Sequence, residues 1–308
     1  MKICIFGGSG SFGTAMTQKL LNETDYEIII FNRSEKAQFE HKQKFNDRRI
    51  SYVIGDIRDY SRVYEVLDGV DYVILASAMK HIDKCEANPY ECIKTNVDGC
   101  INVINASIER NIKKLVFLST DKAANPTTLY GTSKLIVEMY IKSINNKNTS
   151  IITTRYGNVF GSAGSVAYIF ENLAKKGESL TVTNPDMTRF FMKMSEAVDL
   201  VYAALTKGNH KDLWVFNNKS CTIKELADAF SDKQVILGNR CIEKNDECLL
   251  TVNELNHSEI IDNYYRINLN IKSKKEYSEP LTSDNAKRFT KKEIQELIED
   301  WRKRLWKF

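Results

Sequence analysis

A tyrosine and a lysine four residues apart are the strongest candidates for chemistry in this chain. Tyr130 and Lys134 stand in a segment with helical spacing, so they share one face of the expected helix. A nearby cation lowers the pKa of a phenol, and moving that pKa from about 10 to near 7 takes about 4 kcal/mol. A tyrosine tuned in this way can take a proton from a substrate hydroxyl. Taken alone, the same spacing also occurs on ordinary amphipathic helices.

Three further polar side chains come shortly before this helix. Thr120, Asp121 and Lys122 follow the apolar run at residues 115–118, which predicts a buried strand. The hydroxyl of Thr120 can reach a substrate oxygen, and Asp121 and Lys122 place an acid and a base beside it. With Tyr130 and Lys134 they form the predicted catalytic group. The alternative is a solvated loop that leads into a surface helix.

A glycine-rich loop follows the first apolar run of the chain, residues 2–6. Gly7, Gly10 and Gly13 stand at three-residue intervals between that predicted strand and a helix expected at residues 14–21. Such glycines allow the tight turn, the approach of a pyrophosphate and close helix packing, and the helix N-terminus favours phosphates. The loop therefore predicts a dinucleotide site made by Gly7, Ser9, Gly10, Ser11, Phe12 and Gly13.

The residues after the second predicted strand, 27–31, bear on which dinucleotide is bound. A site that prefers NAD usually carries an acid here for the ribose 2′-hydroxyl. In this chain Arg33, Ser34 and Lys36 are suited instead to a 2′-phosphate, and Glu35 is the alternative that would suit NAD. We expect NADP rather than NAD.

Further cofactor contacts are expected at the ends of the next strands, residues 50–54 and 72–76. Asp56 could bind the adenine amino group with Ile57 against the ring, or Asp56 could only cap the helix at 60–67. The small residues Ala76, Ser77 and Ala78 would let the nicotinamide ribose lie against the backbone.

The end of the fourth strand also carries larger polar groups. Lys80 and His81 come at the mouth of the expected cleft, where they could meet cofactor or substrate, although a lone histidine is more often structural. Asn96, on a long helix expected at about residues 91–110, is included in the cofactor site.

Strands and helices alternate five times before residue 145, which predicts an α/β fold with a doubly wound parallel sheet. We expect a dinucleotide-binding domain over residues 1–165, with later strands returning from about 190–218. Residues 166–308 are expected to form mainly a smaller substrate-binding cap. Ser195 and Thr222 are the expected N-caps of helices at 195–205 and 223–230.

Composition narrows the class of protein. The 308 residues carry 44 basic and 40 acidic side chains, a net charge of +4 that does not indicate nucleic-acid binding. The seven cysteines include no Cys-x-x-Cys pair, so we expect reduced thiols and no metal site. No apolar run approaches the roughly 18 residues of a spanning helix, and we expect a cytoplasmic protein.

Together these motifs resemble a known family. The glycine loop, Thr120 and the Tyr130/Lys134 pair are similar to those of extended short-chain dehydrogenase/reductases. More narrowly, the run Ser-Thr-Asp-Lys-Ala-Ala-Asn-Pro and the following Leu-Tyr-Gly-x-x-Lys resemble UDP-N-acetylglucosamine 4,6-dehydratases. The 5-inverting branch, which starts pseudaminic acid synthesis, is the most similar, since related members have Met in place of Tyr130. The resemblance extends from residue 2 to about residue 247.

The resemblance implies a redox-neutral dehydration of UDP-N-acetylglucosamine or a close UDP-amino sugar. Tyr130 would take the O4 proton while NADP⁺ takes the C4 hydride, and Thr120 would bind O4. Neutral Lys122 would remove the C5 proton and protonated Asp121 would protonate the leaving O6. Hydride returned to C6 and reprotonation of C5 would give the inverted 4-keto-6-deoxy sugar.

The resemblance also implies residues that bind the substrate and an oligomeric state. Asn158, Arg189 and Arg240 would bind the uridine diphosphate, joined by Lys80 and His81, and a homo-oligomer is expected. The turn that carries Arg240 departs from the family pattern because Cys241-Ile242 replaces its Pro-Gly.

Two other functions remain open at this point. A UDP-sugar 4-epimerase on the same scaffold would need no Asp-Lys pair after Thr120. A non-catalytic NADP-sensing protein would usually have lost the tyrosine or the lysine, and both are present here.

Overall fold

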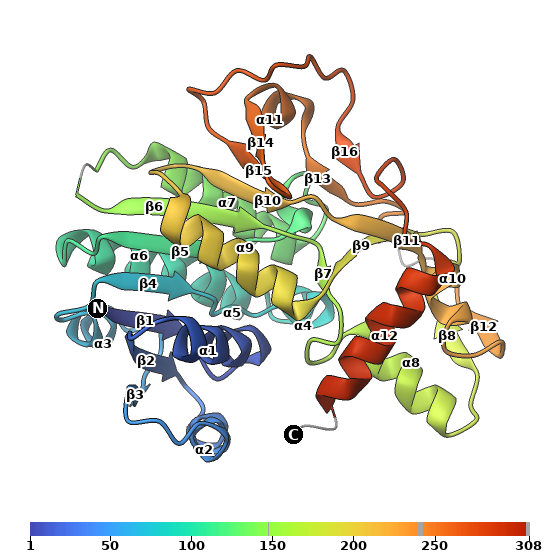
Figure 1. Cartoon of the computed structure of the whole chain (residues 1–308), viewed down its shortest axis with the longest axis horizontal. Coiled ribbons are helices and arrows are strands. Elements are labelled where there is room, and N and C mark those ends of the chain that lie inside the picture. Colours follow the sequence, from blue (N-terminus) through green and yellow to red (C-terminus); the bar gives the residue numbers. More distant parts are fainter. Residues whose placement is uncertain (147, 239–242, 306–308) are drawn as a thin grey trace.

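The computed structural model describes residues 1–146, 148–238 and 243–305, and a nine-stranded sheet forms the centre of that part of the chain (Figure 1). The strand order is β14-β15-β10-β6-β5-β4-β1-β2-β3. The strands are β1 Lys2–Phe6, β2 Glu27–Asn32, β3 Ile50–Ile54, β4 Tyr72–Leu75, β5 Lys114–Leu118, β6 Ser150–Arg155, β10 Leu213–Phe216, β14 Ser258–Ile261 and β15 Tyr264–Ile267.

The predicted doubly wound parallel sheet is confirmed. Strands β3, β2, β1, β4, β5, β6 and β10 are parallel, and β1 lies between β2 and β4. The connections reverse direction at β1, so the carboxyl ends of the strands open a crevice there. The sequence analysis did not foresee β15 and β14, which extend the sheet with antiparallel pairings beyond β10.

Alternate side chains of the strands pack into two helical layers. In β1, Ile3 and Ile5 face a core with α1 (Ser11–Glu23) and α9 (Met194–Lys207), and Cys4 and Phe6 face the opposite core. The second core is covered by α3 (Tyr60–Val66), α6 (Gly99–Glu109) and α7 (Leu129–Ser143). Helix α2 (Glu35–Lys44) follows β2. Because β1, β2, β4 and β5 bury apolar side chains on both faces, the centre of the sheet is held from both sides.

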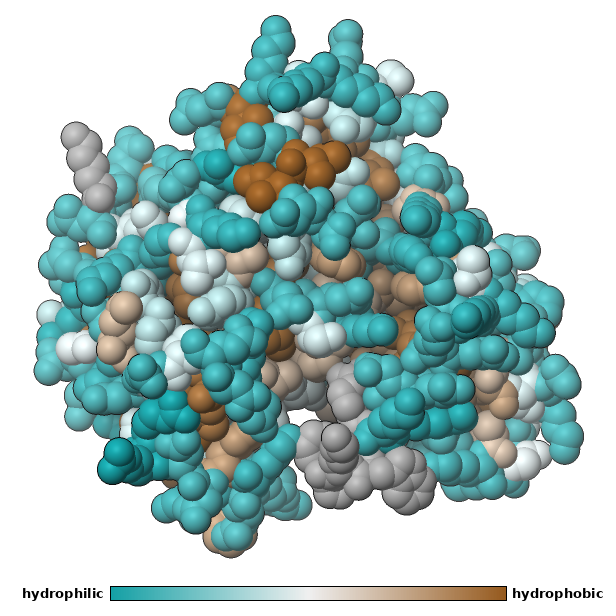
Figure 2. All heavy atoms as spheres, viewed as in Figure 1, coloured by the Kyte–Doolittle hydropathy of each residue, from teal (hydrophilic) through white to brown (hydrophobic). Residues whose placement is uncertain are grey.

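The second half of the chain builds a smaller part beside this sheet (Figure 1), and Figure 2 shows the surface hollowed along the boundary between them. Its core holds Phe160, Phe170, Leu226 and Trp301. Its elements are β7 Asn158–Val159, α8 Val166–Lys175, β8 Leu180–Val182, β9 Thr188–Met192, β11 Lys219–Thr222, α10 Ile223–Asp228, β12 Gln234–Ile236 and α12 Lys291–Leu305. The remaining elements, β13 Cys248–Leu250, α11 Val252–Asn256 and β16 Leu281–Thr282, pack against β10 and β15 of the large sheet.

The sequence analysis expected strands of the dinucleotide-binding domain at about residues 190–218. The strands found there, β9 and β10, have different partners. Strand β10 joins the large sheet next to β6. Strand β9 pairs with β7 and β11 in a separate three-stranded sheet. The chain therefore passes repeatedly between the two parts, and it carries side chains from both to their boundary.

Local predictions were partly wrong. The helix expected at 91–110 consists of α5 (Pro89–Ile93), a π-helical turn (Lys94–Asp98) and α6, and α4 (Ile82–Ala87) precedes it. Helix α9 begins at Met194, so Ser195 is not its cap; the Glu196 carboxylate accepts from the Lys193 amide N–H at 2.7 Å. Thr222 does cap α10, accepting from the Glu225 N–H at 3.0 Å.

Three observations on the described residues concern membrane-spanning helices, cysteines and metal ligands. None of their helices has the length and apolar character needed to cross a bilayer. The six cysteines among them are buried thiols. No group of three potential metal ligands gathers anywhere in the same ranges.

Candidate active site

A pocket of about 1130 Å³ lies where the strands of the large sheet end. Residues that follow β1, β2, β3, β4, β5 and β6 all contribute to its wall, as do β9 and the segment before β13. The pocket thus occupies the crevice that the strand order predicts. It holds both the glycine loop and the predicted catalytic group.

The glycine loop at one end of the pocket fits a dinucleotide pyrophosphate. Gly7 has a φ of +83°, and a Cβ at that position would lie 2.9 Å from the Ser77 amide nitrogen. A Cβ at Gly13 would lie 2.3 Å from the Gly8 carbonyl oxygen, so the start of α1 packs directly on the loop. Gly10 gives α1 no side-chain cap, which leaves its first N–H groups available to an anion. Ser9, Ser11 and Phe12 line the pocket as expected.

The residues expected at the adenosine end lie together, with one exception. Arg33, Ser34, Asp56 and Ile57 line the pocket, and so do Ala76, Ser77 and Ala78 further along. Lys36 does not: its side chain is 85% exposed and its Nζ lies 3.7 Å from Glu40. Because Lys36 follows the Ser34 cap on the outer side of α2, it points to solvent.

Asp56 is an ion-pair partner rather than a helix cap. Arg58 binds its Oδ2 at 2.9 and 2.7 Å, and Arg33 Nη1 lies 3.5 Å from the same oxygen. Burial raises the pKa of Asp56, but the hydrogen bonds and charge of Arg58 outweigh burial and the net shift is downward. The cap of α3 is Asp59, which accepts from the Arg62 N–H at 3.1 Å.

Asn96 supports the pocket from behind and does not line it, contrary to the prediction. Its amide group accepts from the Met79 N–H at 2.8 Å and donates to the Met79 carbonyl at 2.9 Å and to Ser133 Oγ at 3.1 Å. It stands on the π-helical turn, which places Thr95 at the pocket wall instead. Asn96 therefore fixes the loop after β4 against α7.

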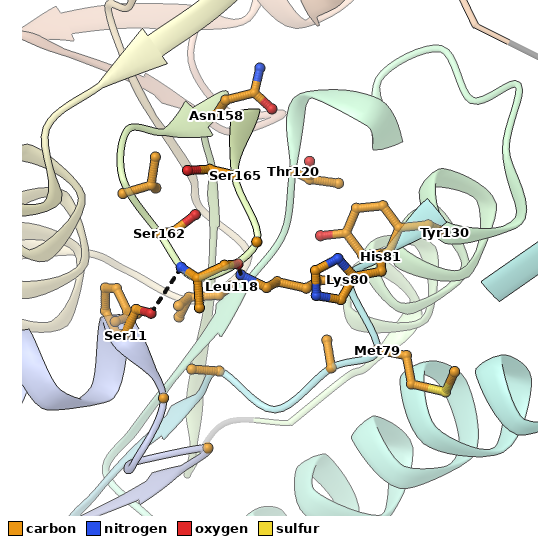
Figure 3. A pocket seen from close by; sticks show the side chains of 18 of the residues that line it. Ser11, Met79, Lys80, His81, Leu118, Thr120, Tyr130, Asn158, Ser162 and Ser165 are labelled. Carbon is orange, nitrogen blue, oxygen red and sulfur yellow. Dashed lines mark hydrogen bonds between the residues drawn. The ribbon is translucent and has the colours of Figure 1, made fainter. Parts of the chain in front are cut away.

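The predicted catalytic group is brought together. Asp121 Oδ1 accepts from Thr120 Oγ1 at 2.9 Å and from Lys122 Nζ at 3.0 Å. Tyr130 reaches the same space from α7, and Figure 3 shows its hydroxyl on the side of Thr120. Asp121 is buried under this surface, and the Thr120, Lys122, Tyr130 and Lys134 side chains face the pocket.

Lys134 does not act on Tyr130 in the way the spacing predicted. Its Nζ donates to the Leu118 carbonyl at 2.8 Å and lies 4.6 Å from the centre of the Phe117 ring. Burial raises the pKa of Tyr130 to about 12, and the Lys122 cation and the hydrogen bond with Thr120 only partly oppose that rise. Burial lowers the pKa of Lys134 itself. In the ligand-free protein the pKa of Tyr130 is therefore raised, and a lowered pKa would need the bound cofactor.

The protonation state of Lys122 also differs from the one expected. Burial lowers its pKa, but the carboxylates of Asp121 and Glu247 outweigh burial and the net shift is upward. Glu247 Oε1 lies 3.5 Å from Lys122 Nζ. The ligand-free site holds Lys122 as an ammonium rather than as a neutral base.

The expected substrate residues that the structure describes also line the pocket. Lys80 Nζ donates to the Ala163 carbonyl at 2.7 Å, and the Ala163 N–H donates to Ser11 Oγ at 3.3 Å, so the loop after β7 is tied to both sides (Figure 3). The ring of His81 packs on Gly164, where a Cβ would lie 2.4 Å from it. Asn158 donates to the Phe190 carbonyl at 3.2 Å.

Arg189 organises the segment that carries Glu247. Its guanidinium donates to the carbonyls of Thr188 (2.7 Å), Asn245 (2.9 Å) and Lys244 (2.8 Å). Arg240, the remaining predicted contact, lies outside the described residues. The sequence analysis did not include Glu247 among the site residues, because no local spacing connects it with Lys122. The only signal in the sequence was that the resemblance to the family ends at about this residue.

Comparisons with known proteins agree with this geometry. Residues 3–269 match a family described as polysaccharide biosynthesis protein. The chain is 40% identical over 278 residues to UDP-N-acetylglucosamine 4,6-dehydratase (inverting) of Campylobacter jejuni, covering 88% of this chain and 83% of that protein. It is 37% identical over 322 residues to UDP-glucose 4-epimerase of Rickettsia rickettsii, covering 96% and 94%.

A solved structure shares the whole architecture. The X-ray structure of Pen from Bacillus thuringiensis superposes with a TM-score of 0.92 at 32% identity, covering 98% of this chain and 97% of that one. With the family match, this similarity confirms the resemblance to extended short-chain dehydrogenase/reductases. The chain belongs to the polysaccharide biosynthesis protein family, and it is a nucleotide-sugar dehydratase or epimerase of the extended short-chain dehydrogenase/reductase type.

Proposed function

We propose that this protein is a UDP-N-acetylglucosamine 4,6-dehydratase that inverts C5. The observation that carries the proposal is the Asp121–Lys122 pair, hydrogen-bonded at 3.0 Å beside Thr120 in the pocket wall. Elimination of water needs a base at C5 and an acid at O6, whereas epimerisation at C4 needs neither. The Campylobacter jejuni relative, a UDP-N-acetylglucosamine 4,6-dehydratase (inverting), supports the same function.

The cofactor proposed is NADP, held by the glycine loop, Arg33 and Ser34. When bound, it accepts a hydride from the sugar and returns one to it. Arg33 is 56% exposed at the pocket and its only described ion pair is the 3.5 Å contact with Asp56. A 2′-phosphate is a stronger partner for a guanidinium than this long contact.

The chain's own groups divide the proton transfers between them. Tyr130 is placed to take the proton of the sugar O4, with Thr120 binding that oxygen. The Lys122 ammonium can pass a proton to Asp121 along their 3.0 Å hydrogen bond. That transfer leaves a neutral amine and a carboxylic acid with the proton count unchanged. The amine then takes the C5 proton as the C6–O bond breaks, and Asp121 protonates the leaving oxygen to give water.

Substrate binding is assigned to the same pocket as the cofactor. The residues Lys80, His81, Asn158 and Arg189 line it, and Arg240 is proposed with them for the diphosphate.

A second candidate function is C4 epimerisation of a UDP-sugar. It is favoured by the Rickettsia rickettsii relative, which this chain matches over more of its length than the dehydratase.

Isotope tracing separates the two functions. Purified protein is incubated with UDP-N-acetylglucosamine deuterated at C4, in ordinary water, and the sugar is followed by NMR. A dehydratase moves the deuterium to C6 of a 4-keto-6-deoxy product. Deuterium that stays at C4 with that centre inverted would establish the epimerase instead.

A parallel reaction of unlabelled sugar in heavy water tests the inversion. C5 should gain deuterium, and the couplings of the product or a trapped derivative should report the L-arabino configuration. A 6-deoxy product with the original C5 configuration would retain the dehydratase and reject the inverting subclass.

Substitution of Arg33 tests the cofactor. We expect Arg33→Ala to weaken NADP⁺ binding by about 10–100-fold, because a hydrogen-bonded charge pair contributes about 1.5–3 kcal/mol. NAD⁺ affinity should change little. Isothermal titration with each dinucleotide gives both values, and Lys36→Ala, on the solvent side of α2, is the matched control. Tighter binding of NAD⁺ by the unmodified protein would exclude the NADP assignment.

A further inference from the structure

Glu247 is a buried acid that the proposed proton transfers do not use. It lies in the segment just before β13, and its backbone is fixed to Ser283 in both directions. The Glu247 N–H donates to Ser283 Oγ at 2.9 Å, and the Ser283 N–H donates to the Glu247 carbonyl at 2.8 Å. Its side chain is 7% exposed and faces the pocket. These backbone hydrogen bonds therefore fix the position of the Glu247 carboxylate in the wall of the pocket.

The two oxygens of this carboxylate face two lysines. Oε1 lies 3.5 Å from Lys122 Nζ, and Oε2 lies 3.8 Å from Lys244 Nζ. Oε2 is buried without a hydrogen-bond partner among the described residues. Lys244 Nζ in turn donates to the Asn125 carbonyl. A carboxylate with spare hydrogen-bonding capacity thus borders the base that elimination requires.

The charges around Lys122 come from several elements. Asp121 is its neighbour in the chain, Glu247 comes from the segment before β13, and Arg189 from β9 opposes both carboxylates. Tyr130 on α7 completes the surroundings. Of the two anions, only Glu247 comes from the distal half of the chain.

We propose that Glu247 is a positioning residue that acts through Lys122: its carboxylate holds the ammonium facing Asp121 and so controls when Lys122 can serve as a base. The proposal rests on the proposed function in one respect, namely that Lys122 is the base of the elimination. The simpler alternative is that Glu247 only compensates the charge of Lys244. The two differ in whether the protonation of Lys122 depends on Glu247.

Competitive acylation measures that dependence without any turnover. The ligand-free protein is treated with trace acetic anhydride at a fixed alkaline pH, and mass spectrometry compares labelling of Lys122 with that of the exposed Lys292. An anion at this range raises a lysine pKa by about 1–3 units, so its removal raises the amine fraction. We expect Glu247→Gln to increase relative labelling of Lys122 at least about tenfold. Glu247→Asp, which keeps the charge, should stay near wild type.

Turnover supplies the second readout. With UDP-N-acetylglucosamine, kcat should fall in Glu247→Gln while KM changes less, and Glu247→Asp should recover kcat in part. In a single turnover, reduction of the cofactor by the sugar should stay near the wild-type rate, because that step depends on Tyr130, and the later release of product should slow. Glu276→Gln removes an exposed carboxylate from the same part of the chain and should match wild type. Unchanged Lys122 labelling in Glu247→Gln, or equal changes in Glu247→Gln and Glu247→Asp, would overturn the role. Absence of dehydration by the wild type would reject the proposed function while leaving the labelling result to decide the role of Glu247.

Discussion

Tyr130→Phe is expected to lower kcat by about 10²–10⁴-fold, the usual effect of losing a positioned acid or base. Tyr130 lines the pocket beside Thr120 and Lys122, and burial raises the pKa of its phenol to about 12. The hydroxyl is therefore protonated in the free protein at neutral pH. Because only the deprotonated form can accept the O4 proton, kcat of the wild type should rise as pH increases until that proton is lost. The bound cofactor's cation would bring the rise to lower pH.

The step that fails identifies the role of Tyr130. A single turnover of the loaded protein, followed by the near-ultraviolet absorbance of the reduced cofactor, should show no reduction in Tyr130→Phe. Lys122→Ala is the matched comparison, and it should reduce the cofactor and then release no product. If Lys122→Ala turned over normally, Lys122 would not be the base, and His81 would be the next candidate in the pocket wall.

The second large effect concerns stability. Arg155→Met is expected to lower the free energy of unfolding by about 3–5 kcal/mol, because it leaves two buried carboxylates without their cation. Arg155 is 1% exposed and binds Glu138 at 2.5 and 3.2 Å and Glu254 at 2.9 and 3.0 Å. It also donates to the Leu249 carbonyl at 3.0 Å. Arg155, the last residue of β6, thus connects α7 with β13 and α11.

Urea denaturation with matched variants tests this assignment. Arg62→Met breaks a surface pair with Glu65 and should cost no more than about 1 kcal/mol. A triple variant with Arg155→Met, Glu138→Gln and Glu254→Gln should lose less than the sum of its single changes, since it removes all three charges together. Equal losses in Arg155→Met and Arg62→Met would mean that the buried network contributes little.

Local patterns predicted the elements that depend on neighbouring residues. The apolar run before Gly7 and the loop that follows it are both short-range signals, and they placed β1, α1 and the pocket correctly. The pair of Tyr130 and Lys134 also falls on one helix, as its spacing requires. These predictions succeed because the controlling interactions lie within a few residues.

Other features depend on contacts that spacing cannot show. The Lys134 ammonium finds the Leu118 carbonyl at the end of β5 instead of acting on Tyr130. The π-helical turn redirects Asn96 to Met79, and the helical pattern gives no sign of that insertion. Glu247 reaches Lys122 through the pairing of β13 with β16, the contacts of Ser283 and the hydrogen bonds of Arg189. Each of these outcomes was decided by tertiary contacts.

The buried arginine also has a consequence for the order in which the chain is completed on the ribosome. Arg155 and Glu254 are 99 positions apart. At typical synthesis rates, roughly 5–20 s pass between the appearance of the first and of the second. During that interval Arg155 has Glu138 but not its second carboxylate, and until β10 (Leu213–Phe216) has been synthesised β6 also lacks its next strand in the sheet. The nascent chain therefore carries an open sheet edge next to a half-compensated charge until its last third emerges, which makes that interval the stage most exposed to misassembly.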